Sequence, residues 1–167
     1  MKKKTLMVRG GITGDEKTGA VSVPIYQVST YRQPKAGEHT GYEYSRTANP
    51  TRTALESLIA ELEGGAAGYA FGSGMAAITA VMMLFDSGDH VILTDDVYGG
   101  TYRVMTGVLN RFGIEADFVD TSSEEKVKKA IRPNTNAIYI ETPTNPLLRV
   151  TDLKLMSDIG KEAGVLL

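Results

Sequence analysis

Glycine-rich residues 70–77 (Ala-Phe-Gly-Ser-Gly-Met-Ala-Ala) have the composition of a turn that leads into a helix. Glycines let a backbone pass close to an anion, and the first free N–H groups of a helix favour negative charge. No Gly-Lys-Ser/Thr follows, as a P-loop would need, and Ala77 stands at the third glycine position of a dinucleotide fingerprint. The segment therefore predicts a phosphate-binding turn of another kind, with an ordinary tight turn as the alternative.

Residues 42–51 place an aromatic hydroxyl and a guanidinium two positions apart, at Tyr44 and Arg46. On an extended segment these two side chains project to the same side. Arginine binds phosphate through a charged fork, and tyrosine adds a neutral donor. The pair predicts a second phosphate contact, and a solvated turn before a helix is the alternative.

Two further segments, residues 95–101 and 141–146, each follow a predicted strand. The ring of Tyr98 could lie flat on an aromatic ligand or could pack against the next helix. Glu141 and Asn145 belong to a loop that two prolines stiffen, which could aim their side chains or could be only a rigid connection. Because α/β sheets bind ligands at the carboxyl ends of strands, both segments are candidate ligand loops.

Alternating helices and short apolar strands must position these segments. Residues 1–48 lack a sustained helical period and predict an extended arm, and Asn49-Pro50 begins an amphipathic helix that ends at Gly64. The later pattern predicts a largely parallel sheet with helices on its faces. In chain order the expected elements are an apolar, buried helix 75–85, strand 90–94, helix 100–112, strand 116–119, a helix to 131 with a capping box of Ser122 and Glu125, strand 136–141 and helix 152–163.

The last three residues, Val165-Leu166-Leu167, have the character of the start of a buried strand. A domain that ended there would leave an apolar strand unpaired. We therefore expect truncation within a strand. The predicted organisation is an arm and first helix, residues 1–63, and an incomplete domain, residues 64–167.

The composition indicates one globular core, with 42% apolar and 23% charged residues and a net charge of −2. This charge gives no reason to expect a nucleic-acid partner. The absence of cysteine excludes disulfides and thiolate zinc sites, and His39 and His90 alone do not suggest a metal site. Neither a signal peptide nor the about 20 apolar residues of a membrane span occurs, so no membrane partner is expected and a cytoplasmic location is predicted.

Taken together, the order and spacing of four motifs resemble the Cys/Met-metabolism family of pyridoxal-phosphate (PLP) enzymes of fold type I. The motifs are Tyr-Ser-Arg-x-x-Asn-Pro-Thr, Ser-Gly-Met-Ala-Ala, Asp-x-Tyr-Gly-Gly-Thr and Glu-Thr-Pro-Thr-Asn-Pro, and the resemblance covers essentially the whole chain. It implies an α/β fold, namely the first part of a PLP-dependent transferase large domain preceded by an extended N-terminal arm. It also implies PLP as cofactor and the activity of a cystathionine gamma-lyase or gamma-synthase.

The resemblance assigns cofactor contacts to four residues of the later motifs. The backbone amides of Gly74 and Met75 would bind the cofactor phosphate. Tyr98 would stack on the pyridine ring and support proton transfer, and Asn145 would bond the phenolic oxygen.

Four other residues receive roles toward a neighbouring subunit or the substrate. Tyr44 and Arg46 would reach the phosphate in a neighbouring subunit. Glu43 would face the distal end of the substrate, and Glu141 is a second candidate for substrate binding. The implied partners are a sulfur amino acid (cystathionine, or acylated homoserine plus cysteine) and further copies of the chain in a homotetramer built from dimers with shared sites.

The Schiff-base lysine that such an enzyme requires is absent from the predicted site. The ten lysines lie on the arm or on amphipathic helices, and none follows a strand: Lys2, Lys3, Lys4, Lys17, Lys35, Lys126, Lys128, Lys129, Lys154 and Lys161. We therefore expect the full-length parent to be a C–S lyase or transferase and this fragment to be inactive.

Other functions are also compatible with the pattern. A non-catalytic phosphate- or nucleotide-binding α/β module and a dimerisation fragment are alternatives from different classes. Within the enzyme interpretation, gamma-lyase, gamma-synthase, beta-lyase and methionine gamma-lyase activities share all these motifs. Gly100 stands where the methionine gamma-lyase variant has a cysteine, which disfavours that variant.

Overall fold

The computed structural model describes residues 2–12, 14–38 and 40–167. His39 lies outside the described residues. The chain forms two compact units, residues 1–71 and residues 72–167, called here the N-terminal unit and the C-terminal unit. The predicted division into parts 1–63 and 64–167 as domains of a longer protein stays a prediction.

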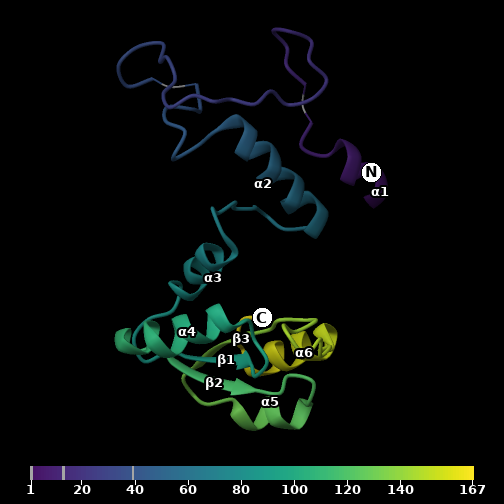
Figure 1. The fold of residues 1–167 in the computed structure, drawn as a ribbon, viewed down its shortest axis with the longest axis vertical. Helices are drawn as coiled ribbons and strands as arrows, with labels where there is room; N and C mark the ends of the chain where they lie inside the picture. The colour runs from purple at the N-terminus through teal and green to yellow at the C-terminus, as the bar shows by residue number, and fades with distance from the viewer. Residues whose placement is uncertain (1, 13, 39) are drawn as a thin grey trace. The chain divides into compact units, whose positions relative to one another are not determined.

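The N-terminal unit contains the helices α1 (Lys3–Arg9) and α2 (Pro50–Glu63) (Figure 1). As predicted, Asn49 caps α2, Pro50 occupies its first position and Gly64 ends it in the left-handed region with φ 67°. Helix α1 was not predicted, because seven residues are too few to show a clear period. Short helices need tertiary packing, and α1 contacts α2 with Leu6 buried.

The rest of the N-terminal unit is an extended arm with short pieces of structure, as predicted. Residues 29–31 run antiparallel to residues 43–45 and form a bridge between Thr30 and Tyr44. The N–H of Tyr31 donates to the Glu43 carbonyl at 3.1 Å, and the N–H of Ser45 donates to the Ser29 carbonyl at 2.9 Å. This pairing holds the segment that carries Tyr44.

A parallel sheet of three strands forms the centre of the C-terminal unit. The strands are β1 (His90–Thr94), β2 (Glu115–Val119) and β3 (Thr135–Tyr139), in the order β2-β1-β3. Leu166 pairs with Ala137 in a further parallel bridge, so the end of the chain runs beside β3. The carboxyl ends of all three strands therefore share one edge, where the loops with Tyr98 and Asn145 begin.

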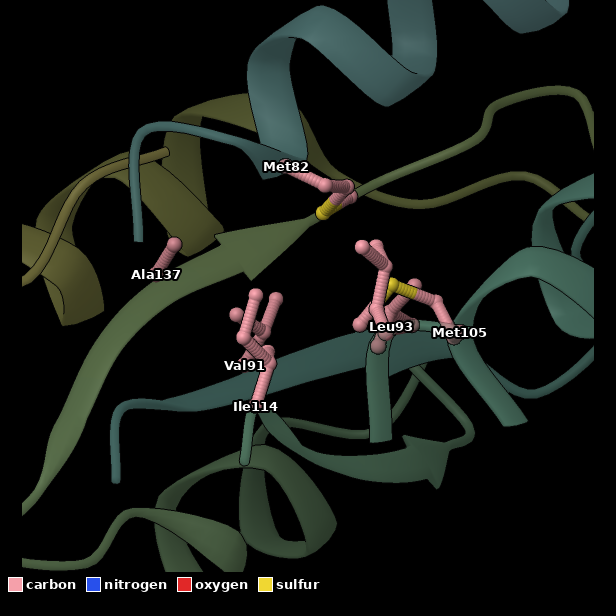
Figure 2. Packing of buried hydrophobic residues seen from close by; sticks show 7 residues of the cluster. Met82, Val91, Leu93, Met105, Ile114 and Ala137 are labelled. Atoms are coloured by element: carbon pink, nitrogen blue, oxygen red, sulfur yellow. The ribbon is translucent and has the colours of Figure 1, made fainter. Parts of the chain in front are cut away.

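Helices cover both faces of this sheet, which confirms the predicted fold class, and Figure 1 shows α4 and α5 on opposite sides of it. One face packs against α3 (Gly74–Met82), α4 (Gly99–Gly107) and the 3-10 helix η1 (Leu109–Phe112). The other packs against α5 (Glu124–Ala130) and α6 (Leu153–Ala163). Alternation along β1 divides its side chains: Val91 and Leu93 join the first cluster and Ile92 joins the second. Figure 2 shows Leu93 beside Met105 of α4 in the first cluster.

Three local expectations for the C-terminal unit were wrong. The predicted helix 100–112 is divided, because α4 ends at Gly107 and Leu109–Phe112 form the 3-10 helix η1. The cap of α5 is Ser123, whose hydroxyl accepts the N–H of Lys126, whereas the predicted cap, Ser122, donates its own hydroxyl to Asp120 at 2.5 Å. The apolar helix α3 was expected to be buried, but only Met82 is buried and Leu84, just beyond its end, is 73% exposed. An apolar helix is expected to be covered by other residues. Its sequence does not show that other residues of this chain are the ones that cover it.

Candidate functional site

The phosphate-binding turn predicted at residues 70–77 lies at the start of α3. Ser73 caps the helix, and its hydroxyl accepts the N–H of Ala76 at 3.1 Å. Within the described part of the chain, the N–H groups of Gly74 and Met75 have no acceptor. A Cβ added at Gly72 or Gly74 would meet no atom within 4 Å, so the turn is open to a ligand. Two free N–H groups at the positive end of a helix suit an anion such as phosphate.

The loop after β1 places Tyr98 next to this turn. Gly100 is buried, and a Cβ there would lie 2.5 Å from Tyr98 Cε1 and 2.6 Å from Met75 Sδ. The edge of the Tyr98 ring and the Met75 side chain therefore both lie against the bare Cα of Gly100. Since Tyr98 remains 44% exposed, part of its ring is free to contact a ligand. The structure thus places the predicted ring contact, Tyr98, next to a predicted phosphate contact, Met75.

Glu141 connects the Tyr98 loop with the Asn145 loop. Its Oε2 accepts the N–H of Tyr98 at 2.9 Å, and its Oε1 accepts the N–H of Asn145 at 3.0 Å. The Asn145 side chain is exposed, and its amide has no hydrogen bond among the described residues, so it is free for a ligand. The peptide bonds before Pro143 and Pro146 are cis. The predicted contact of Glu141 with a substrate stays a prediction.

Sequence reasoning missed a second link between the same two loops. Asp96 Oδ2 accepts the Thr144 hydroxyl at 2.5 Å and the N–H of Leu147 at 3.0 Å. Its neighbour Asp95 forms an ion pair with Arg149 at 3.1 Å. The available signal was two adjacent carboxylates directly after a strand, but their partners lie about fifty residues further along the chain.

A chain of hydrogen bonds between three buried threonines supports these loops. The hydroxyl of Thr94, the last residue of β1, lies 3.1 Å from that of Thr121, which lies 2.8 Å from that of Thr151. Thr94 also accepts the N–H of Glu141 at 3.2 Å. All three threonines are at most 5% exposed. Buried hydroxyls need partners, and this chain of bonds supplies them while anchoring the backbone of Glu141.

In the N-terminal unit, the predicted Tyr44 and Arg46 pair is present. Arg46 Nη2 donates to the Tyr44 hydroxyl at 2.9 Å. The pair lies in a turn and not in the extended segment that was expected, because the N–H groups of Thr47 and Ala48 both donate to the Tyr44 carbonyl at 3.0 Å. Glu43, which precedes Tyr44 in the chain, is exposed. Contacts of Tyr44 and Arg46 with a phosphate, and of Glu43 with a substrate, stay predictions.

The lysines of the C-terminal unit lie away from the candidate ligand groups. All of them belong to α5 or α6. Lys126 pairs with Asp120 at 2.9 Å, and hydrogen bonds from Ser122 and then Lys126 lower the pKa of Asp120 to about 2. No described lysine of this unit therefore occupies the loops that carry Tyr98 and Asn145.

Comparison with known protein families identifies the chain. The family model described as Cys/Met metabolism PLP-dependent enzyme matches residues 4–167. The chain belongs to this family. Membership confirms the predicted fold and cofactor class, and it leaves the nucleotide-binding alternative without support.

Two relatives and one solved structure show how far the similarity of this family member extends. Cystathionine gamma-lyase of Bacillus subtilis (strain 168) is 84% identical over 167 residues, covering 100% of this chain and 44% of the relative. Cystathionine beta-lyase of Lactococcus lactis subsp. cremoris (strain MG1363) is 58% identical over 158 residues, 95% of this chain and 42% of the relative. The crystal structure of cystathionine gamma-lyase from Lactobacillus plantarum complexed with L-serine matches with a TM-score of 0.94 and 53% identity, over 99% of this chain and 43% of that one.

The chain thus spans less than half the length of these two relatives and of that solved chain. The residues that it does contain fit PLP, because free N–H groups, a partly exposed tyrosine ring and a free amide lie on neighbouring loops of the C-terminal unit. In the described residues no group of three or more His, Cys, Asp or Glu side chains could hold a metal ion. None of the described helices combines the length and apolar character that a bilayer crossing requires.

Proposed function

We propose that this chain supplies the cofactor phosphate and ring contacts of a PLP-dependent transsulfuration enzyme. The enzyme is a cystathionine gamma-lyase, which acts on cystathionine, or a gamma-synthase, which acts on acylated homoserine and cysteine. One observation carries the proposal: the turn with the unpaired N–H groups of Gly74 and Met75 lies next to Tyr98. The side chains of Met75 and Tyr98 both lie against Gly100. The similarity to the B. subtilis gamma-lyase supports the gamma-lyase type.

The chain's own groups would divide the work of binding. The N–H groups of Gly74 and Met75 would bind the phosphate, with the dipole of α3 favouring its charge. The exposed part of the Tyr98 ring would lie on the pyridine ring, and the free amide of Asn145 would bond the phenolic oxygen. When bound, PLP supplies an electron sink for charge that develops beside the amino group of the substrate.

Residues of the N-terminal unit would complete the site in an assembly. The Arg46 guanidinium and Tyr44 hydroxyl already form one hydrogen-bonded pair, which would bind the phosphate in a neighbouring subunit. Glu43 would face the distal end of the substrate. A homotetramer with shared sites and a cytoplasmic location are part of the same proposal.

The experiment is a chimera in which this chain replaces the matched 167 residues of the B. subtilis cystathionine gamma-lyase. We expect the chimera to bind PLP and to release cysteine from cystathionine, because cleavage of the gamma C–S bond leaves sulfur on cysteine. Release of homocysteine would indicate beta cleavage and would contradict the assignment. The 167-residue chain alone, which lacks a site lysine, should release neither product.

A substitution within the chimera tests the site itself. Gly100→Ala would place a methyl group within 2.6 Å of both Tyr98 and Met75, so we expect a loss of PLP affinity of about tenfold or more and a destabilisation of about 1–3 kcal/mol. Gly99→Ala is the matched control, since its Cβ would meet only the flexible Arg103 side chain, at 3.2 Å. Equal PLP affinity in the two variants would show that the close contact at Gly100 does not shape the site.

A further inference from the structure

Glu141 begins the loop that carries Asn145 and is bonded to the loop that carries Tyr98, the two loops of the proposed ring contacts. Tyr98 and Asn145 lie on different loops, and each donates its backbone N–H to a different oxygen of the same carboxylate, at 2.9 Å and 3.0 Å. A carboxylate has two oxygens that accept hydrogen bonds, and bonds to a charged acceptor are stronger than neutral ones. One side chain therefore ties both loops together.

The carboxylate is itself held in place. The N–H of Glu141 donates to the hydroxyl of Thr94 at 3.2 Å, and Thr94 is 2% exposed at the end of β1. Thr94 belongs to the buried threonine chain that continues to Thr121 and Thr151. The Glu141 side chain thus starts from a point fixed to the sheet, which is what a group that positions others requires.

Both oxygens of Glu141 accept N–H groups of the chain itself, one from each of the segments that carry the proposed ring contacts. We infer that Glu141 is a positioning residue, which sets the distance between the Tyr98 ring and the Asn145 amide so that both meet the cofactor ring at once. The inference deepens the proposed function and rests on it. It assigns to Glu141 a role toward the cofactor-binding loops in place of one toward the substrate.

The neighbouring Asp96 provides a matched comparison. It also joins the two loops, but a single oxygen, Oδ2, accepts both the Thr144 hydroxyl and the Leu147 N–H. In Asp96→Asn the remaining amide oxygen can accept both bonds. In Glu141→Gln only one of the two oxygens remains, and the amide NH₂ that replaces the other faces a backbone N–H and cannot accept it.

The test uses the chimera with the B. subtilis enzyme and compares Glu141→Gln, Asp96→Asn and Glu125→Gln, the last an exposed carboxylate on α5. Hydrogen exchange, read by mass spectrometry on the enzyme without PLP, reports the N–H groups of Tyr98 and Asn145 directly. We expect Glu141→Gln to accelerate exchange in at least one of the two segments by about tenfold or more, and the other two variants to leave both unchanged.

A second readout uses the enzyme with PLP. The visible circular dichroism of bound PLP reports how its ring is held, and we expect Glu141→Gln to change it and to weaken PLP binding by about ten- to a hundredfold. Unchanged exchange and dichroism, with only KM for cystathionine raised, would overturn the inference and support a substrate contact. An unsubstituted chimera that binds no PLP would instead overturn the proposed function, while the exchange measurement would still test Glu141.

A variant that unfolds is distinguished by the exchange of β1. If the amides of residues 91–93 exchange faster in Glu141→Gln as well, Glu141→Asp replaces it, because the shorter side chain cannot span both loops. The inference is wrong if exchange at Tyr98 and Asn145 in that variant rises no more than exchange in β1.

Discussion

The two units of the molecule hold their candidate ligand groups by different forces. In the C-terminal unit, two clusters of buried apolar side chains fix the sheet from which the Tyr98 and Asn145 loops extend. In the described part of the N-terminal unit, Leu6 is the one buried hydrophobic residue, whereas Val21 and Ile25 are each 78% exposed. Polar bonds hold the turn with Tyr44 and Arg46 instead.

Some of those polar bonds come from residues 28–31, and others come from side chains that follow the turn in sequence. Arg52 donates to the carbonyl of Thr47 at 2.7 Å, and Asn49 donates to the Ser45 hydroxyl at 3.1 Å. Such bonds contribute about 1 kcal/mol each, whereas burying one large apolar side chain contributes about 1.5–3 kcal/mol. The comparison teaches that hydrogen bonds hold the turn in the N-terminal unit, whereas a buried apolar core holds the sheet that carries the site in the C-terminal unit.

The largest expected effect comes from the apolar core. Met105, fully buried on α4, contacts the first cluster, so Met105→Ala should lower the free energy of unfolding of the C-terminal unit by about 2–5 kcal/mol. Met7→Ala is the control, since Met7 is 67% exposed and its loss should cost about 0.5 kcal/mol or less. Urea unfolding measures both, and similar losses would break the comparison between the units.

An intermediate effect is expected from the cap of α2. Asn49→Ala removes the acceptor of the Thr51 N–H and the donor to the Tyr26 carbonyl, so we expect a loss of about 1 kcal/mol, measured by urea unfolding. Asn49→Asp keeps the acceptor and removes the donor. A smaller loss in Asn49→Asp would assign the effect to the helix cap, and equal losses would assign it to the arm.

The smallest effect concerns pH and His90. This side chain is fully buried in β1, with Nδ1 2.8 Å from the Thr135 hydroxyl. Burial lowers the pKa of His90 below its usual 6.5, and Arg132 lowers it further, while Asp117 and Glu115 oppose the shift. The unfolded chain therefore binds a proton more readily than the folded one. The stability contribution is present above pH 6.5 and is lost as pH falls from there toward the lowered folded pKa.

The measurement is urea unfolding of the C-terminal unit between pH 5 and 8, with His90→Asn as comparison. We expect the part of the pH dependence that is due to His90 to disappear in the variant. A variant that keeps the same slope would show that another group is responsible. Asp120 would not be that group, because its pKa, lowered to about 2, means that its contribution to stability changes only below about pH 4.

Local features of the fold could be predicted from the sequence because their causes lie within a few residues. The cap at Asn49 and the helix ends at Gly64 and Gly164 are such features. The alternation of apolar strands and amphipathic helices determined the parallel sheet and its two covered faces in the same way. The family motifs identified Gly74, Met75, Tyr98 and Asn145 as candidates for one site.

Only the tertiary structure decided how those candidates are held. Glu141 meets the N–H of Tyr98 across 43 positions, and Asp96 meets Thr144 across 48. No spacing rule predicts such bonds, because they depend on the parallel strands β1 and β3 ending at the same edge of the sheet. The sequence by itself determined which residues could bind a cofactor. The alignment of the strand ends decided that the buried threonines and the Glu141 carboxylate hold the loops of Tyr98 and Asn145 in place.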